Sequence, residues 1–97
     1  MYMDWDDFFD SLPGGEIARR GLADLERGMT TVPSLLVLIG GPRLRNLGLP
    51  VPEADCNPEH ALYNLLSEHD PDSAHARYNA LIRTLVSFER AAECAKR

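Results

Sequence analysis

The C-terminal segment constrains the fold of this chain most strongly, because its apolar residues repeat with the period of an α-helix. On a helical projection of residues 72–97, one side is polar and carries Arg83, Ser87 and Arg90. The apolar side of the same projection collects Ala74, Tyr78, Leu81, Ile82, Leu85, Phe88, Ala92 and Ala95. An amphipathic helix of this kind is unstable alone in water, so the rest of the chain or a partner must cover it.

A short helix is predicted near the N-terminus, over Asp4–Leu12. The apolar residues of this segment follow the i, i+3, i+4, i+7 spacing of one helical face: Trp5, Phe8, Phe9 and Leu12. Aspartates occupy the other face, and Pro13-Gly14-Gly15 ends the helix. The result is a small helix with an acidic side and an aromatic side.

A second helix is predicted over Glu16–Met29. Its apolar stripe consists of Ile17, Ala18, Gly21, Leu22, Leu25 and Met29. Glycine on a buried stripe lowers helix propensity, but it lets another helix approach closely. We therefore expect a close helix contact at Gly21.

The segment Leu35–Ile39 is apolar on every side, which fits either a buried helix or a buried strand. A lone strand could not satisfy its backbone hydrogen bonds, and nothing else in the chain resembles a strand, so we predict a buried helix. Thr31 or Ser34 can cap its start. Gly40-Gly41-Pro42 ends or kinks it, and a further turn or two follows over Arg43–Leu47.

Another helix is predicted over Pro58–Glu68, because Asn57 can cap it and proline suits its first position. The expected fold is an all-α, compact single-domain bundle of four to five helices across residues 1–97, with a long C-terminal amphipathic helix.

Composition and charge disfavour several classes of function. The formal net charge is −5, which disfavours general binding to a phosphate backbone. The longest apolar run, Leu35–Ile39, is too short to span a bilayer. The acidic N-terminus lacks the apolar segment of a secretory signal, so we expect a cytoplasmic location with Cys56 and Cys94 reduced.

No pattern of residues indicates catalysis, a cofactor or a metal. Cys56 and His60 form at most one weak zinc half-site, and His69 and His75 do not complete it at ligand spacing. The clustered carboxylates are better explained by solvation and helix capping, and the glycines form no phosphate-binding pattern. We therefore expect no catalytic residue, cofactor or metal.

A DNA-binding helix-turn-helix can be drawn from Glu16 to Ile39, but its second helix is unsuitable. A recognition helix presents polar side chains to base edges, whereas Leu35–Ile39 is apolar on every side. Nucleic acid is therefore an unlikely partner.

Protein binding has two indications. Aromatic residues on one face of a short helix, as in Trp5, Phe8, Phe9 and Leu12, are typical anchors for a groove on a partner, and Arg43 and Arg45 could add charged contacts. The competing interpretation is that this face closes the chain's own core. The small residues Ala76, Ala80, Thr84 and Ala91 could admit a partner helix or a second copy, or simply reflect tight packing within the chain.

Three functional hypotheses follow. The first is a small non-catalytic protein-interaction module, such as an accessory or regulatory subunit that acts through a helical surface. The second is an acidic inhibitor or antitoxin-like mimic that covers a basic site, with binding that weakens steeply as salt is added. The third is a small DNA-associated regulator, which a shift assay at low salt would detect.

Substituting Phe8→Ala separates the two interpretations of the aromatic face. If Phe8 anchors a partner, the variant loses the complex and keeps its thermal stability. If Phe8 belongs to the core, the free energy of unfolding falls by about 3–5 kcal/mol instead. Thermal and chemical denaturation of the isolated protein distinguishes these outcomes.

Overall fold

The computed structural model describes residues 5–95, and this part of the chain folds into six α-helices without a strand. In chain order they are α1 (Trp5–Asp10), α2 (Gly15–Glu26), α3 (Val32–Ile39), α4 (Gly41–Asn46), α5 (Pro58–His69) and α6 (Ala74–Ala95). The predicted all-α fold with a long C-terminal helix is confirmed. The bundle measures 46 × 24 × 19 Å along its principal axes, and the 22 residues of α6 extend along much of the longest one.

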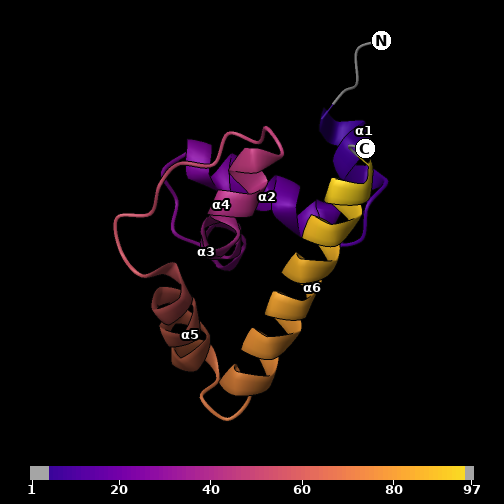
Figure 1. Cartoon of the computed structure of the whole chain (residues 1–97). Helices are drawn as coiled ribbons and strands as arrows, with labels where there is room; N and C mark the ends of the chain where they lie inside the picture. The colour runs from indigo at the N-terminus through magenta and orange to yellow at the C-terminus, as the bar shows by residue number, and fades with distance from the viewer. Residues whose placement is uncertain (1–4, 96–97) are drawn as a thin grey trace.

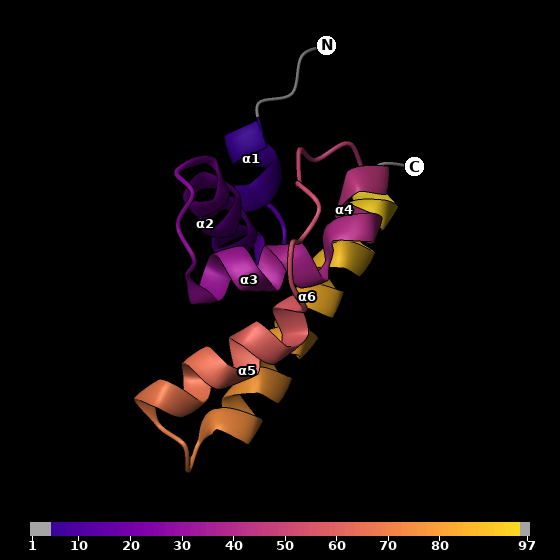
Figure 2. The same cartoon turned by 90° about the vertical axis from the view of Figure 1, so that its left-hand side faces the viewer.

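Helix α3 lies at the centre of the bundle and contacts α2, α4, α5 and α6 (Figures 1 and 2). Leu35, Leu36 and Val37 are each at most 3% exposed, and Leu38 and Ile39 are partly buried. The prediction of a buried helix rather than a strand is therefore confirmed. Neighbours on several sides explain why the sequence of α3 is apolar all round.

The N-terminal end of α3 is fixed by local hydrogen bonds. The backbone N–H of Ser34 donates to the Thr31 hydroxyl at 3.2 Å, and the N–H of Thr31 donates to the Ser34 hydroxyl at 2.8 Å. This reciprocal pair is a capping box at the N-terminus of the helix. The Thr31 hydroxyl also donates to the Asp24 carboxylate at 2.6 Å, which ties the start of α3 to α2. Helix α4 begins at Gly41, directly after the C-cap of α3 at Gly40.

Helices α2 and α3 approach closely at Gly21, as the sequence predicts. A β-carbon at this position would lie 2.4 Å from the carbonyl oxygen of Pro33 and 2.4 Å from Cγ2 of Val37. Real side chains do not tolerate such distances, so α3 can occupy its observed position only because residue 21 has no side chain.

Two clusters of buried side chains connect α3 to its neighbours. One joins α1, α2, α4, residues 47–51 and the C-terminal half of α6, through Phe8, Phe9, Ala18, Val37, Leu44, Leu47, Leu49, Val51, Phe88 and Ala92. The other joins α5 and the N-terminal half of α6, through Leu35, Leu36, Leu62, Leu66, Ala74 and Leu85. The partly buried Leu38 packs against both clusters, so the core is continuous through α3.

Three details differ from the sequence predictions. Helix α2 ends at Glu26 because Gly28 adopts a positive φ of 70°, so Met29 lies beyond the helix and is 45% exposed. Helix α1 ends at Asp10, and Leu12 lies in the following turn. The predicted loop after α4 is irregular, but Leu49 and Val51 within it are buried against the core.

Substituting Gly21→Ala should destabilise the protein by about 1–3 kcal/mol, because the added methyl group forces α2 and α3 apart. Alanine favours a helix by about 1 kcal/mol relative to glycine, so a Gly21→Ala variant that is more stable than the wild type would contradict the close approach. Gly41→Ala is the matched control, since its nearest neighbour is the flexible guanidinium of Arg45 at 3.1 Å. Denaturant unfolding of the two variants should show a loss for Gly21→Ala alone.

Candidate functional site

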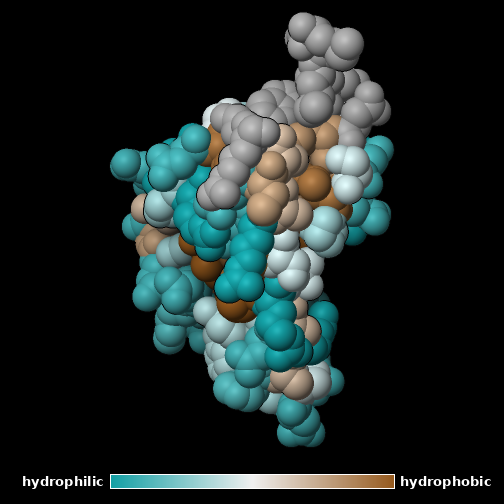
Figure 3. Space-filling model, turned by 45° about the vertical axis from the view of Figure 1, so that its right-hand side comes forward, coloured by the Kyte–Doolittle hydropathy of each residue, from teal (hydrophilic) through white to brown (hydrophobic). Residues whose placement is uncertain are grey.

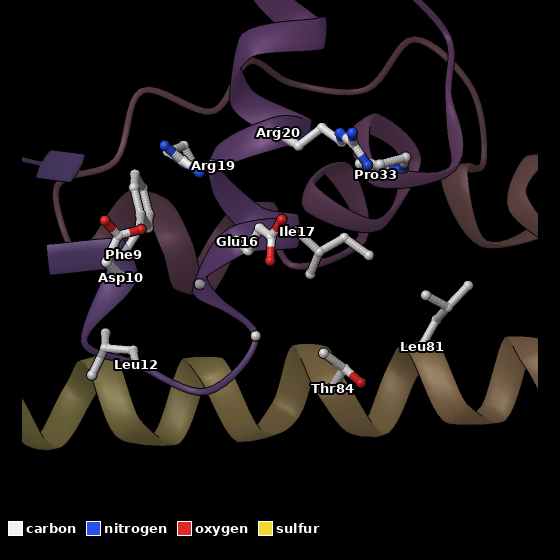
Figure 4. A pocket seen from close by; sticks show the side chains of 12 residues that line it. Phe9, Asp10, Leu12, Glu16, Ile17, Arg19, Arg20, Pro33, Leu81 and Thr84 are labelled. Carbon is white, nitrogen blue, oxygen red and sulfur yellow. The ribbon is translucent and has the colours of Figure 1, made fainter. Parts of the chain in front are cut away.

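A groove between α2 and α6 has a volume of about 680 Å³ (Figure 4). Leu81 and Thr84 of α6 form one wall, and Ile17 of α2 and Pro33 of α3 lie opposite. Phe9, Asp10 and Leu12 close one end, where α1 turns into α2. The volume falls within the range of about 300–1,000 Å³ that is typical of ligand pockets. We call this hollow the α2–α6 groove.

The turn between α1 and α2 determines the shape of the groove. Gly14 has a positive φ of 74°, and a β-carbon there would lie 3.0 Å from Cγ2 and the carbonyl oxygen of Thr84. A β-carbon at Gly15 would overlap the backbone of Phe9. Gly14 therefore lets the turn lie directly on α6, and Gly15 lets α2 start against the backbone of α1; the groove opens beside these contacts.

The rim of the groove carries charges of both signs. Arg19 and Arg20 are exposed on α2, and neither makes an ion pair with another residue in the described part of the chain. Asp10 and Glu16 are also exposed at the rim. Because Ile17, Pro33 and Leu81 offer apolar contacts between these charged side chains, the groove suits an apolar group from a polar molecule.

The predicted aromatic anchors lie mostly in the core. Phe8 and Phe9 are 8% and 3% exposed, and the rings of Phe9 and Phe88 are 5.8 Å apart. This burial favours the competing interpretation, in which the aromatic face of α1 closes the chain's own core. Leu12 is partly buried and lines the α2–α6 groove. The side chain of Trp5 lies outside the described residues.

The two predicted charged contacts, Arg43 and Arg45, are both engaged within the chain. Nη1 of Arg43 lies 3.3 Å from the carboxylate of Glu89, and Nη2 lies 2.5 Å from that of Glu93. Nη1 of Arg45 donates to the carbonyl oxygens of Val51 and Pro52, each at 3.2 Å. Arg43 thus joins α4 to α6, and Arg45 holds the loop that follows α4.

Glu89 is a buried carboxylate that the sequence analysis did not identify. The residue is only 4% exposed, although glutamate is rarely buried without a partner. The pKa of Glu89 is raised above its ordinary value, mainly by burial. The attraction of Arg43 lowers this pKa, and the repulsion of Glu93 raises it further. The hydrogen bond from Arg43 to Glu93 and the charge of Glu89 raise the pKa of Arg43 in turn.

A signal for Glu89 was present in the sequence. Leu85, Phe88 and Ala92 surround it at i−4, i−1 and i+3, and all three belong to the predicted apolar stripe. An acidic residue at the edge of such a stripe requires a cation from elsewhere in the fold. Its partner Arg43 is distant along the chain, so periodicity alone could not pair them.

The cysteines and histidines do not converge. Cys56 and Cys94 are free and exposed, and residues 5–95 contain no cluster of three or more His, Cys, Asp or Glu side chains able to hold a metal ion. His75 instead lies 3.2 Å from the side-chain amide of Asn79 on the same helix. No helix among these residues is long and apolar enough to cross a membrane.

The raised pKa of Glu89 predicts a pH dependence of stability. Because the folded state holds this proton more tightly than the unfolded state, Glu89 favours folding below its unfolded pKa, and the contribution is lost as the pH rises through the folded pKa. The stability of the wild type relative to Glu89→Gln should therefore fall as the pH rises above about 4.3, the ordinary pKa of glutamate. Denaturant unfolding across a series of pH values tests the sign. If the stability of the wild type relative to Glu89→Gln rose with pH instead, the attraction of Arg43 would lower the pKa of Glu89 more than burial raises it.

Comparison of the chain with protein-family models, with curated proteins and with solved structures gives no match. Any functional assignment therefore rests on the residues and surfaces described above. The α2–α6 groove and the buried Glu89 with its partner Arg43 are the two features from which a functional proposal can be argued.

Proposed function

We propose that this protein is a small protein-interaction module, an accessory or regulatory subunit without catalysis of its own. The observation that carries the proposal is the α2–α6 groove, a hollow of about 680 Å³ with partly exposed apolar walls. In the proposed complex, an apolar side chain of the partner enters between Ile17 and Leu81. The charged rim then orients the polar part of the partner.

The distribution of apolar surface supports a local contact. On the face shown in Figure 3, hydrophobic surface occurs in small patches that hydrophilic residues interrupt. Of the large hydrophobic side chains whose exposure the structure describes, only Met29 and Tyr63 are strongly exposed, at 45% and 38%. A broad obligate interface would require a larger continuous apolar face. A groove that receives one or two side chains suits a smaller, reversible contact.

The mixed charge of the rim distinguishes this proposal from the acidic-inhibitor hypothesis. An inhibitor that mimics a polyanion needs a surface dominated by carboxylates, whereas Arg19 and Arg20 accompany Asp10 and Glu16 here. Binding through apolar walls should depend only moderately on salt. A steep loss of affinity with added salt would favour the acidic inhibitor instead.

The test is a selection of displayed random peptides on the immobilised full chain, followed by affinity measurements with the enriched peptides. We expect enriched peptides to share an apolar anchor. We also expect Leu81→Gln, which makes one wall of the groove polar, to weaken binding by at least about tenfold, or about 1.4 kcal/mol. Fluorescence polarisation with a labelled peptide measures the change.

Met29→Gln is the matched control, because it makes the same kind of change at an exposed apolar residue outside the groove. Its affinity should equal that of the wild type. Circular dichroism melting should show that both variants are folded at the temperature of the assay. Failure to enrich any peptide, or equal binding by Leu81→Gln and the wild type, would contradict the proposal.

A further inference from the structure

A second hollow lies on the other flank of α6, where α3 passes into α4. Its volume is about 240 Å³, and its walls are mostly apolar. Ile39 and Pro42 face Ile82 and Val86 of α6 across it, and Glu89 lies in its lining. We call this hollow the Glu89 pocket. None of its lining residues except Arg43 was identified as a candidate for binding from the sequence.

The carboxylate of Glu89 has one oxygen available to this pocket. Oε1 accepts a hydrogen bond from Arg43 at 3.3 Å, whereas Oε2 accepts none from the described residues. No fully inaccessible side-chain oxygen or nitrogen in residues 8–95 lacks a hydrogen bond, so Oε2 must reach the accessible surface. Gly40 keeps this oxygen uncovered, because a β-carbon there would lie 3.0 Å from Oε2.

We infer that the Glu89 pocket binds a primary ammonium group at the end of an alkyl chain. The alkyl chain lies along Ile39, Ile82 and Val86, and the ammonium donates to Oε2 of Glu89. The site is distinct from the α2–α6 groove, and the inference does not depend on the function proposed for that groove.

The chemistry of the pocket selects this ligand class. A carboxylate accepts about four hydrogen bonds, so the bond from Arg43 leaves capacity at Oε2. A hydrogen bond between two charged groups is stronger than one between neutral groups, and the apolar walls strengthen it further. Arg43 also lines the pocket, but it pairs with both Glu89 and Glu93, so this cluster carries one positive and two negative charges and disfavours an anion. A purely apolar ligand would leave Oε2 without a partner.

The size of the pocket limits the ligand to a single chain. Its volume is below the range of about 300–1,000 Å³ for pockets that enclose drug-sized ligands. A lysine side chain of another protein and a free alkylamine share the required chemistry. The experiment includes one probe for each source.

The test is titration of the ¹⁵N-labelled full chain with n-pentylammonium, monitored by amide chemical shifts. We expect saturable shifts at Ile82, Val86 and Gly40. n-Pentanol and hexanoate have the same pentyl chain with a neutral or negative end, and each should bind at least about tenfold more weakly, since a charge-assisted hydrogen bond contributes more than a neutral one. This comparison uses the wild-type protein alone.

The variant Glu89→Gln keeps the shape of the side chain and removes its charge, so it should weaken binding of n-pentylammonium by a similar factor. Nα-acetyl-lysine methylamide is the second probe: shifts at the same residues would indicate a lysine of a protein partner, and shifts with the free amine alone would indicate a small amine. Absence of saturable shifts with n-pentylammonium, or equal affinity for n-pentanol, would overturn the inference.

Discussion

The burial of α3 is the constraint on which the rest of the structure depends. A helix with Leu, Val and Ile on every side must be covered on every side, because each such side chain left in water forgoes about 1.5–3 kcal/mol of stabilisation. Helices α2, α4, α5 and α6 surround α3 and provide this cover.

The two hollows on the surface, the α2–α6 groove and the Glu89 pocket, follow from the way in which α6 packs against α3 and the other helices. Helix α6 is much longer than α3, so its N-terminal half packs beside α5 and its C-terminal half beside α1 (Figure 1). The C-terminal half also contacts α4 through the pair of Arg43 and Glu89. Its two flanks are covered unevenly between these contacts. The α2–α6 groove opens on one flank, and the Glu89 pocket opens on the other. Both candidate sites are consequences of one long helix that shorter neighbours do not fully cover.

Helix positions could be predicted from the sequence because their signals are local. The period of α6, the Thr31 and Ser34 cap of α3 and the Asn57 cap of α5 each depend on residues within a few positions of one another. The close approach at Gly21 could be predicted because glycine within a helix lowers its stability, and contact with a second helix offsets that loss. Met29 was misplaced because the positive φ of Gly28 ends α2 earlier than the apolar stripe does.

The candidate sites could not be predicted, because they depend on contacts between distant segments. Arg43 and Glu89 are far apart in sequence, and only the packing of α4 on α6 brings them together. The groove likewise needs the α1–α2 turn to lie on α6, which no periodicity encodes. The amphipathic pattern of α1 predicts a face that must be covered, but the pattern is the same whether a partner or the core covers it. The structure places Phe8 and Phe9 in the core.

Amide hydrogen exchange followed by NMR tests the central role of α3 most directly. If α3 is covered on all sides, the amides of Leu36 to Gly40 should exchange only through global unfolding, with a free energy equal to that from denaturant unfolding. The exposed first turn of α5 should exchange far more readily. Rapid exchange in α3 under conditions where α6 remains protected would show that α3 is not the element on which the fold depends.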